Sequence, residues 1–203
     1  DAGAILHADS DFNVFIGDTV GDATMTAAAD ANVGIGFDAL GTLTSGTENT
    51  VIGAYAGNAI LAGGNNTFIG KSAGGSTEAV VGAVIIGDGA GLGVMTTAAN
   101  GTVAVGLSAG AAITASTNSR ENTLIGNAAG TSMTIGDGSV AVGAFALDAE
   151  VAGNYSVAVG YEALSQQTNA GDTDVHNVAL GYRSGKMNVT GVNNTYVGSQ
   201  AGL

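Results

Sequence analysis

Several residue types are missing from the 203-residue chain or are rare in it. It has no cysteine, proline or tryptophan, and only five Phe and five Tyr. Without cysteine no disulfide can staple the fold, which is compatible with an extracellular protein but does not require one. Because the apolar residues are mainly Ala, Val and Ile, a conventional globular core would be thin. We therefore expect a slim, repetitive architecture.

Positive charge is also scarce. Four Lys and Arg residues stand against 17 Asp and Glu residues, which gives a net charge of -13. A nucleic-acid partner is not expected, because such a surface needs clustered cations that displace counterions. No apolar run approaches the ~18 residues that a transmembrane helix needs, so we expect no membrane insertion in this segment. The first residue is Asp1 rather than Met, which we interpret as a processed chain or a part of a longer one.

Glycine and apolar residues are abundant instead. Glycine accounts for 35 of the 203 residues, and 45% of the residues are hydrophobic. This apolar content excludes a disordered chain, which cannot offset the entropy of ordering. The glycines are regularly placed, because eleven copies of one motif run from Asn13 to Gly202, spaced 17 to 21 residues apart. The motif glycines are Gly17, Gly36, Gly53, Gly70, Gly87, Gly106, Gly126, Gly143, Gly160, Gly181 and Gly198.

Each copy predicts a short strand that ends at its glycine. The residue before the glycine is Ile, Val or Leu in all eleven copies, and the residue two positions earlier is Val or Thr. These two positions share one face of a strand, and the position between them lies on the opposite face. Neither face carries a charge, as in strands that are buried on both sides. A single solenoid chain covers only one face, so we expect the other face to contact another chain.

The remaining motif positions indicate turns and close packing. We expect the motif glycine to allow a positive φ or a close backbone approach after the strand. Three residues later, Ala stands in nine of the eleven copies, with Val20 and Ser184 as exceptions, which indicates a crowded inner corner. Asn or Ser opens most strands, where such side chains bond to turn backbone and stacked Asn residues form ladders.

The segments between the motifs predict loops. Short apolar pieces at 59–61 and 94–95 are candidates for a second strand, and the insertions predict outward loops, the longest at 169–174. Glycine interrupts every helical pattern. The predicted fold is an all-β parallel β-solenoid, or β-roll, of about eleven rungs at ~4.8 Å, roughly 50 Å long. Residues 1–12 are expected to form an N-terminal lead-in, and residues 13–203 a single domain of eleven repeats of 17–21 residues.

The motif SVAVG at 139–143 and 156–160, with NTVIG, NTFIG, NTLIG and NTYVG elsewhere, resembles two related repeat families. One is the head repeat of trimeric autotransporter adhesins, whose SVAIG-like motifs build a trimeric left-handed β-roll. The other is the NTxIGxxAG array of predicted phage tail fibres, which the longer repeat favours. The resemblance covers nearly the whole chain. It implies an intertwined or closely packed homotrimer on a virion or cell surface.

Two short motifs that suggest chemistry are better explained by the repeat. Gly70-Lys71-Ser72 looks like the end of a phosphate-binding loop, but such a loop needs a glycine at position 65, which is Asn65. Segments 70–74 and 106–110 match the Gly-x-Ser-x-Gly nucleophile elbow. Both lie in register with the repeat, and only His7 and His176 are available as bases. We expect solvent-facing corners and no enzyme.

Acidic turns are candidate Ca²⁺ ligands. They lie at 9–11, 87–89, 136–138 and 172–174. None matches an EF-hand loop or the Ca²⁺-binding nonapeptide repeat, so we expect solvated loops and no cofactor, with bound Ca²⁺ as the alternative. No spacing selects a carboxylate pair for glycoside hydrolysis. Ice binding would need a nearly uniform outward Thr face, whereas Thr occupies four of the eleven copies, at a position that we expect to point inward (Thr50, Thr67, Thr123 and Thr195).

The leading interpretation is a structural and adhesive fibre segment, a viral tail-fibre shaft or head that attaches to a host or cell surface outside the cell. Its expected partners are two further copies of itself, other fibre or virion proteins, and a host glycan or protein receptor bound multivalently. The alternatives are a bacterial trimeric autotransporter adhesin head and a passive extracellular filament component. A polysaccharide-degrading enzyme is the rival from another class, but the Asp and Glu residues are scattered over the loops.

Overall fold

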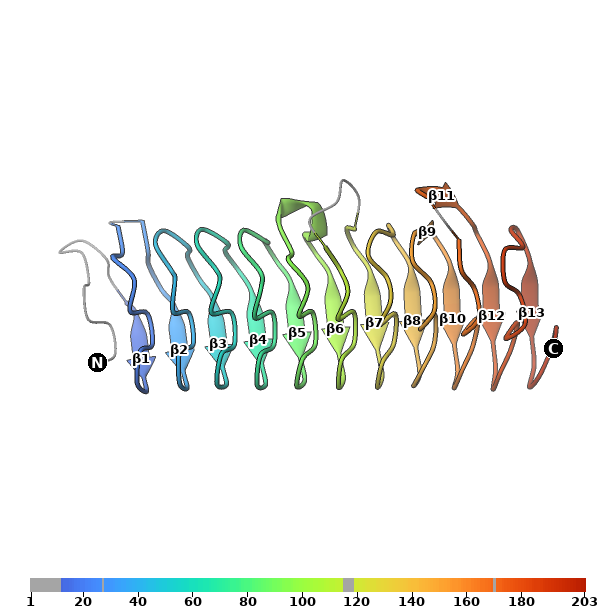
Figure 1. The fold of residues 1–203 in the computed structure, drawn as a ribbon, viewed down its shortest axis with the longest axis horizontal. Coiled ribbons are helices and arrows are strands. Elements are labelled where there is room, and N and C mark those ends of the chain that lie inside the picture. The colour runs from blue at the N-terminus through green and yellow to red at the C-terminus, as the bar shows by residue number, and fades with distance from the viewer. Residues whose placement is uncertain (1–11, 27, 115–118, 170) are drawn as a thin grey trace.

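The computed structural model of the protein describes residues 12–26, 28–114, 119–169 and 171–203. Eleven three-residue strands pair in parallel, each with the next, in one sheet (Figure 1). The all-β parallel β-solenoid predicted from the sequence is therefore confirmed. The strands of this sheet are β1 (Val14–Ile16), β2 (Val33–Ile35), β3 (Thr50–Ile52), β4 (Thr67–Ile69), β5 (Val84–Ile86), β6 (Val103–Val105), β7 (Thr123–Ile125), β8 (Val140–Val142), β10 (Val157–Val159), β12 (Val178–Leu180) and β13 (Thr195–Val197).

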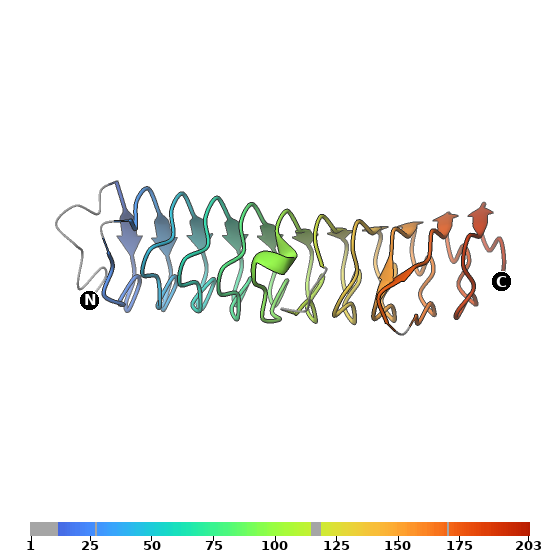
Figure 2. The ribbon, with the colours of Figure 1, turned by 90° about the horizontal axis from the view of Figure 1, so that it is seen from above.

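The described residues form a rod in which the sheet runs along one side. Figure 2 shows the eleven strands on that side and the connecting loops on the other. Equivalent motif positions lie side by side in every pair, as with Thr50 beside Thr67 and Ile52 beside Ile69. A residue type that recurs in the motif therefore forms a continuous row along the rod.

The residue at the centre of each strand points into the solenoid. Val51, Phe68, Ile85 and Leu124 are fully buried, whereas the residues that flank them are half-buried or exposed. The expectation that the Thr of the motif points inward was therefore wrong. Both faces of the strand are apolar, so the alternation of residue types does not indicate which face is the core. The predicted crowded corner is present, because the motif alanines from Ala39 to Ala163 are fully buried.

The second wall of the solenoid is built mainly from loops. The predicted second strands at 59–61 and 94–95 were wrong, because neither segment pairs as a strand. Ile60 and Met95 are nevertheless fully buried and fill the core from that side. A separate two-stranded sheet of β9 (Gly153–Asn154) and β11 (Thr173–Asp174) forms at the longest insertion, and a 3₁₀ turn, η1 (Thr97–Ala99), forms at another.

Each rung has space for one large side chain near the strand. The fourth residue after the motif glycine is usually glycine, and a Cβ on Gly74 would lie 2.6 Å from the ring of Phe68. Leucine replaces this glycine in three rungs whose strand centre is Gly or Ala. The leucines are Leu40, Leu147 and Leu164, and the strand centres in their rungs are Gly34, Ala141 and Ala158. In these three rungs the leucine thus fills the volume that a large strand-centre side chain fills elsewhere, whereas both positions are small in the rungs of Ala104 and Ala179.

The motif glycines form a column in which the backbones of successive rungs touch. Gly143 has a φ of +137°, and a Cβ on it would lie 2.5 Å from the carbonyl oxygen of Gly160. The same contact recurs from Gly17 to Gly181, with separations of 2.3 to 2.7 Å. The predicted positive φ and close approach are therefore both present. Only glycine combines this φ with the absence of a side chain.

A ladder of asparagines lies inside the solenoid at the start of β2, β3 and β4. The side-chain nitrogen of Asn49 donates to Oδ1 of Asn32 at 2.9 Å and to the carbonyl of Gly63 at 2.9 Å. Its own Oδ1 accepts from the backbone N–H and the side-chain nitrogen of Asn66. All three residues are buried. The asparagine ladder predicted from the sequence thus satisfies buried polar groups from one rung to the next.

One column of the core changes from apolar to polar near the C-terminal end. Seven residues after the motif glycine, several rungs carry buried apolar residues such as Ile60, whereas two consecutive rungs carry Glu150 and Gln167, both fully buried. Oε1 of Glu150 accepts from the backbone N–H groups of 151–153 and of Asn169. Its Oε2 accepts from the side-chain amides of Gln167 and Asn169, at 2.6 and 3.0 Å. Amide donors alone thus solvate this buried carboxylate.

Candidate functional site

The outward face of the sheet is a mainly apolar strip without charged residues. It consists of the residue before each motif glycine and the Val or Thr two positions earlier. Along β1–β13 none of these positions carries a charge, and Ile52, Ile69 and Ile125 are 36 to 38% exposed. The strip is roughly 50 Å by 10 Å, a size on the scale of the largest apolar patches that single chains expose, which usually mark interaction sites.

The outward strip bears on the ice-binding alternative. An inward-pointing Thr was one reason to expect no ice binding. That reason no longer holds, because the motif Thr faces outward. The composition still counts against ice binding, because Val84 and Val103 interrupt the Thr row between Thr67 and Thr123. The face is therefore best described as an apolar strip with scattered hydroxyl groups.

A second feature lies at the edge of the rod where the strands end. The two residues after each motif glycine form exposed corners, and these carry aromatic rings in three consecutive rungs near the C-terminus. Phe145 packs edge-to-face with Tyr161 at 6.0 Å between ring centroids, and Tyr161 stacks on Tyr182 at 5.7 Å. Arg183 lies 5.0 Å from the centroid of the Tyr182 ring. These rings form a short aromatic row along the edge.

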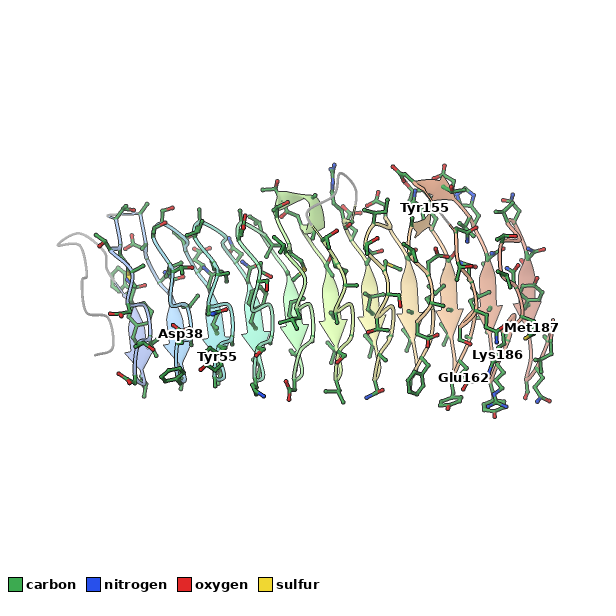
Figure 3. All side chains as sticks on the ribbon, in the orientation of Figure 1. Asp38, Tyr55, Tyr155, Glu162, Lys186 and Met187 are labelled. Atoms are coloured by element: carbon green, nitrogen blue, oxygen red, sulfur yellow. The ribbon has the colours of Figure 1, made fainter. Side chains whose placement is uncertain are left out.

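A cleft of about 360 Å³ opens beside this aromatic row. We call it the corner cleft, and its lining residues are Phe145, Asp148, Tyr161, Glu162, Ser165, Gln166 and Lys186. Glu162 accepts from Nε of Arg183 at 2.8 Å and forms an ion pair with Lys186. Figure 3 shows Glu162 and Lys186 side by side at the lower edge, below β10 and β12. The lining residues come from three consecutive rungs.

The carboxyl groups of the corner cleft are perturbed in opposite directions. Burial raises the pKa of Asp148, and the nearby Glu162 adds to this effect. Hydrogen bonds from Lys186 and Arg183 lower the pKa of Glu162. A hydrogen bond to Glu162 in turn raises the pKa of the Tyr161 phenol. Among the described residues, Oδ1 of Asp148 is buried without a hydrogen-bond partner, although the backbone N–H groups of Asp148 and Ala149 lower the pKa of this carboxyl group.

The residues of the rejected catalytic motifs lie apart. Lys71 directly follows the motif glycine Gly70, whose φ is +130°. It is exposed at the edge of the rod where the strands end. Ser108 follows β6, whereas His176 precedes β12 and stacks on Tyr155 at 5.4 Å. Strands β7, β8 and β10 lie between them. Three strands therefore separate His176 from this serine, and His7 lies outside the described residues.

The acidic turns are partly brought together. Asn154 donates to Oδ1 of Asp172 at 2.6 Å and to Oδ1 of Asp174 at 3.3 Å, and its own Oδ1 accepts from the N–H of Asp137. Within the described parts of the chain, no three His, Cys, Asp or Glu residues are grouped so that they could hold a metal ion. The acidic turn at 9–11 lies outside the described residues.

The sequence analysis did not find the corner cleft. Its residues are up to 41 positions apart, from 145 to 186, and only the strand register places them in neighbouring rungs. The signal that was available is the recurrence of aromatic residues at the two positions after the motif glycine in successive copies, as at Phe145, Tyr161 and Tyr182. Isolated exposed rings are common, but three in register form a row.

The fold and these surfaces define a class: a parallel β-solenoid rod with an open apolar sheet face. No protein-family model matches the chain, and neither a curated protein nor a solved structure matches it. Among the described residues, no helix has the length and apolar character that crossing a membrane requires.

Proposed function

We propose that this protein is a structural and adhesive fibre segment that functions outside the cell as a homotrimer. The carrying observation is the outward strip of the eleven-stranded sheet, along which Ile52 and its equivalents are exposed or half-buried. Burying this strip against two other copies would remove it from water, and ~25 cal/mol is gained per Å² of apolar surface buried. The resemblance of the motif to trimeric β-roll repeats supports the same assembly.

The rod geometry suits a spacer that displays loops. In a parallel solenoid, each rung contacts its neighbours through backbone hydrogen bonds and rows of side chains. These contacts run along the whole rod and resist its bending. Three chains side by side would present three copies of each loop, which raises avidity for a surface glycan or protein receptor. With -13 charges per chain, the acidic surface would keep assembled rods apart in solution.

A tail-fibre shaft or head is the leading assignment, and an adhesin head or a passive filament component shares the same architecture. The rival polysaccharide-degrading enzyme would need two available carboxyl groups beside one substrate. Asp148 and Glu162 meet in the corner cleft, but Glu162 is held by both Lys186 and Arg183. This arrangement favours a binding role over catalysis.

Light scattering of the purified protein tests the assembly. We expect a mass of three times 19.5 kDa and, for the double variant Ile52→Lys/Ile125→Lys, a shift to the monomer with an unchanged far-ultraviolet spectrum. Leu61→Lys is the matched control, since Leu61 is 45% exposed in the same rung but lies outside the sheet. A wild-type monomer would overturn the proposal and would make an ice-recrystallisation assay the next measurement.

A further inference from the structure

We propose that the corner cleft binds a neutral saccharide. The inference rests on the proposed function, because it assigns the receptor-binding role of the fibre segment to one place on the rod. It also specifies the class of ligand that the corner cleft recognises. Three properties of the cleft carry it: an apolar wall, a set of hydrogen-bond donors and acceptors with balanced charge, and a volume that suits one or two sugar rings.

Phe145 and Tyr161 supply the apolar wall, and Tyr182 continues the aromatic row beyond the cleft. The rings of Phe145, Tyr161 and Tyr182 are 37, 42 and 44% exposed, which is high for side chains that dominate the energetics of buried surfaces. Their contacts with one another hold them in a fixed line across three rungs. A preformed line of rings packs against the C–H groups of a pyranose without further ordering of side chains.

The polar side of the cleft offers both donors and acceptors. Lys186 and the amide of Gln166 donate, while Asp148, Glu162 and the Gln166 carbonyl accept. A sugar hydroxyl donates one hydrogen bond and accepts two, so a vicinal diol matches such a mixed set.

The balance of charge selects a neutral ligand. Two carboxylates, Asp148 and Glu162, face two cations, Lys186 and Arg183, at the cleft and its rim. An anionic sugar would meet the carboxylates, and a cationic sugar would meet Lys186. A neutral sugar forms its hydrogen bonds without leaving an unpaired charge.

The volume agrees with this class of ligand. About 360 Å³ lies at the lower end of the ~300–1,000 Å³ that is typical of small-molecule sites. The cleft follows the edge of the rod, so a longer glycan can continue past it in either direction. In a trimer the three equivalent clefts would convert a weak single-site affinity into firm attachment.

Titration with soluble disaccharides tests the assignment. The neutral probes are lactose, cellobiose and N,N′-diacetylchitobiose, with sialyllactose as an anionic probe and de-acetylated chitobiose as a cationic one. Saturation-transfer NMR detects binding, and titration gives the dissociation constant. We expect at least one neutral probe to bind with a Kd of about 1 mM, and at least tenfold more tightly than either charged probe.

Two variants and one control locate the site. Tyr161→Ala and Gln166→Ala are each expected to weaken binding of the neutral probe at least tenfold. Phe37→Ala should leave it unchanged, since Phe37 occupies the same motif position as Tyr161, pairs edge-to-face with Tyr55 at 5.2 Å and is 45% exposed, but does not line the corner cleft. Tyr55 marks that control pair on the same edge in Figure 3.

Failure of the cleft assignment and failure of the proposed function give different results. A trimer to which no neutral probe binds, or whose binding is the same in Tyr161→Ala and Gln166→Ala, overturns the saccharide site and leaves the fibre segment standing. A monomer that binds a neutral probe through Tyr161 and Gln166 keeps the site and overturns the trimeric fibre. Preferential binding of a charged probe also contradicts the charge-balance argument.

Discussion

Replacing one motif glycine by alanine tests whether contact between successive rungs limits this fold. In Gly143→Ala, the new Cβ would lie 2.5 Å from the carbonyl oxygen of Gly160, which is 0.5 Å closer than the 3.0 Å that real Cβ contacts respect. The atoms involved are backbone on both sides, so no side chain can rotate away. The two rungs must separate, or the Gly143 backbone must change its conformation.

The cost has three parts. At a φ of +137°, a non-glycine residue is strained by about 1–3 kcal/mol. Forcing rungs apart adds about 1–3 kcal/mol of overpacking. It also stretches the hydrogen bond from the N–H of Gly160 to the carbonyl of Val142, now 2.8 Å, with a net value of about 1 kcal/mol. We therefore expect Gly143→Ala to lower the free energy of unfolding by about 3–7 kcal/mol.

Two control variants separate these parts. Gly198 has a φ of +122° but no atom within 4 Å of its Cβ position, so Gly198→Ala retains the strain and lacks the collision. Gly89 lies inside the array with a φ of +62°, where other rungs carry residues such as Ser108 at similar φ, so Gly89→Ala should cost about 1 kcal/mol. Urea midpoints from circular dichroism give the comparison.

The order of the three midpoints is decisive. We expect Gly143→Ala to unfold first, well below Gly198→Ala and Gly89→Ala. If Gly143→Ala and Gly198→Ala were equally destabilised, backbone conformation alone would account for the glycine column. The argument from rung contact would then be refuted.

Three further variants address the core, the ladder and the cleft. Asn49→Ala removes two donors and one shared acceptor from the buried asparagine ladder, and we expect a loss of about 3 kcal/mol in urea unfolding, since each unsatisfied buried group costs about 1–3 kcal/mol. Ala158→Phe should be destabilising by about 1–3 kcal/mol through overpacking, and adding Leu164→Gly should restore most of this loss, because the pair then matches the rung of Phe68 and Gly74. The raised pKa of Asp148 means that the folded state binds its proton more tightly than the unfolded state, so this group lowers stability as pH rises above its ordinary value of 3.8. Asp148→Asn should therefore unfold at a higher urea concentration than the wild type at pH 7, with a difference that shrinks toward pH 3.

Each of these variants has an outcome that contradicts it. Asn49→Ser serves as the ladder control, since Ser139 and Ser156 occupy the same motif position. If Asn49→Ala and Asn49→Ser lost the same free energy of unfolding, the hydrogen bonds of the ladder would not contribute to stability. A double variant less stable than Ala158→Phe alone would show that the two positions do not share one volume. If the difference in urea midpoint between Asp148→Asn and the wild type did not change with pH, ionisation of Asp148 would not be its cause.

The repeating parts of the fold could be predicted because the same residue pattern occurs in eleven copies. The strand positions, the positive φ of Gly143 and its equivalents, and the buried corner alanines follow from residue types that recur without exception or nearly so. The direction of the strand faces did not follow. Phe68 at the strand centre and Ile69 beside it are both apolar, so hydrophobicity alone does not separate core from surface.

The features unique to single rungs were the least predictable. Ile60 and Met95 suggested strands because they are apolar, but the loops that carry them bury one side chain without pairing. The complementary sizes of Ala158 and Leu164 become meaningful only when both are known to point into the same space. The corner cleft depends on how the loop side chains of three successive rungs are placed around one space, which the alignment of the motifs does not show.

The buried carboxylate of Glu150 has a consequence for how the chain finds its register. Near-identical repeats offer many alternative alignments, because a rung displaced by one repeat would still place valine beside valine and glycine beside glycine. Such a displaced rung would separate Glu150 from the amides of Gln167 and Asn169 and would leave its buried Oε2 without the two donors that it has in the correct alignment. The hydrogen bonds of Glu150 thus favour one alignment of the C-terminal rungs over the others, although the repeats themselves are nearly identical.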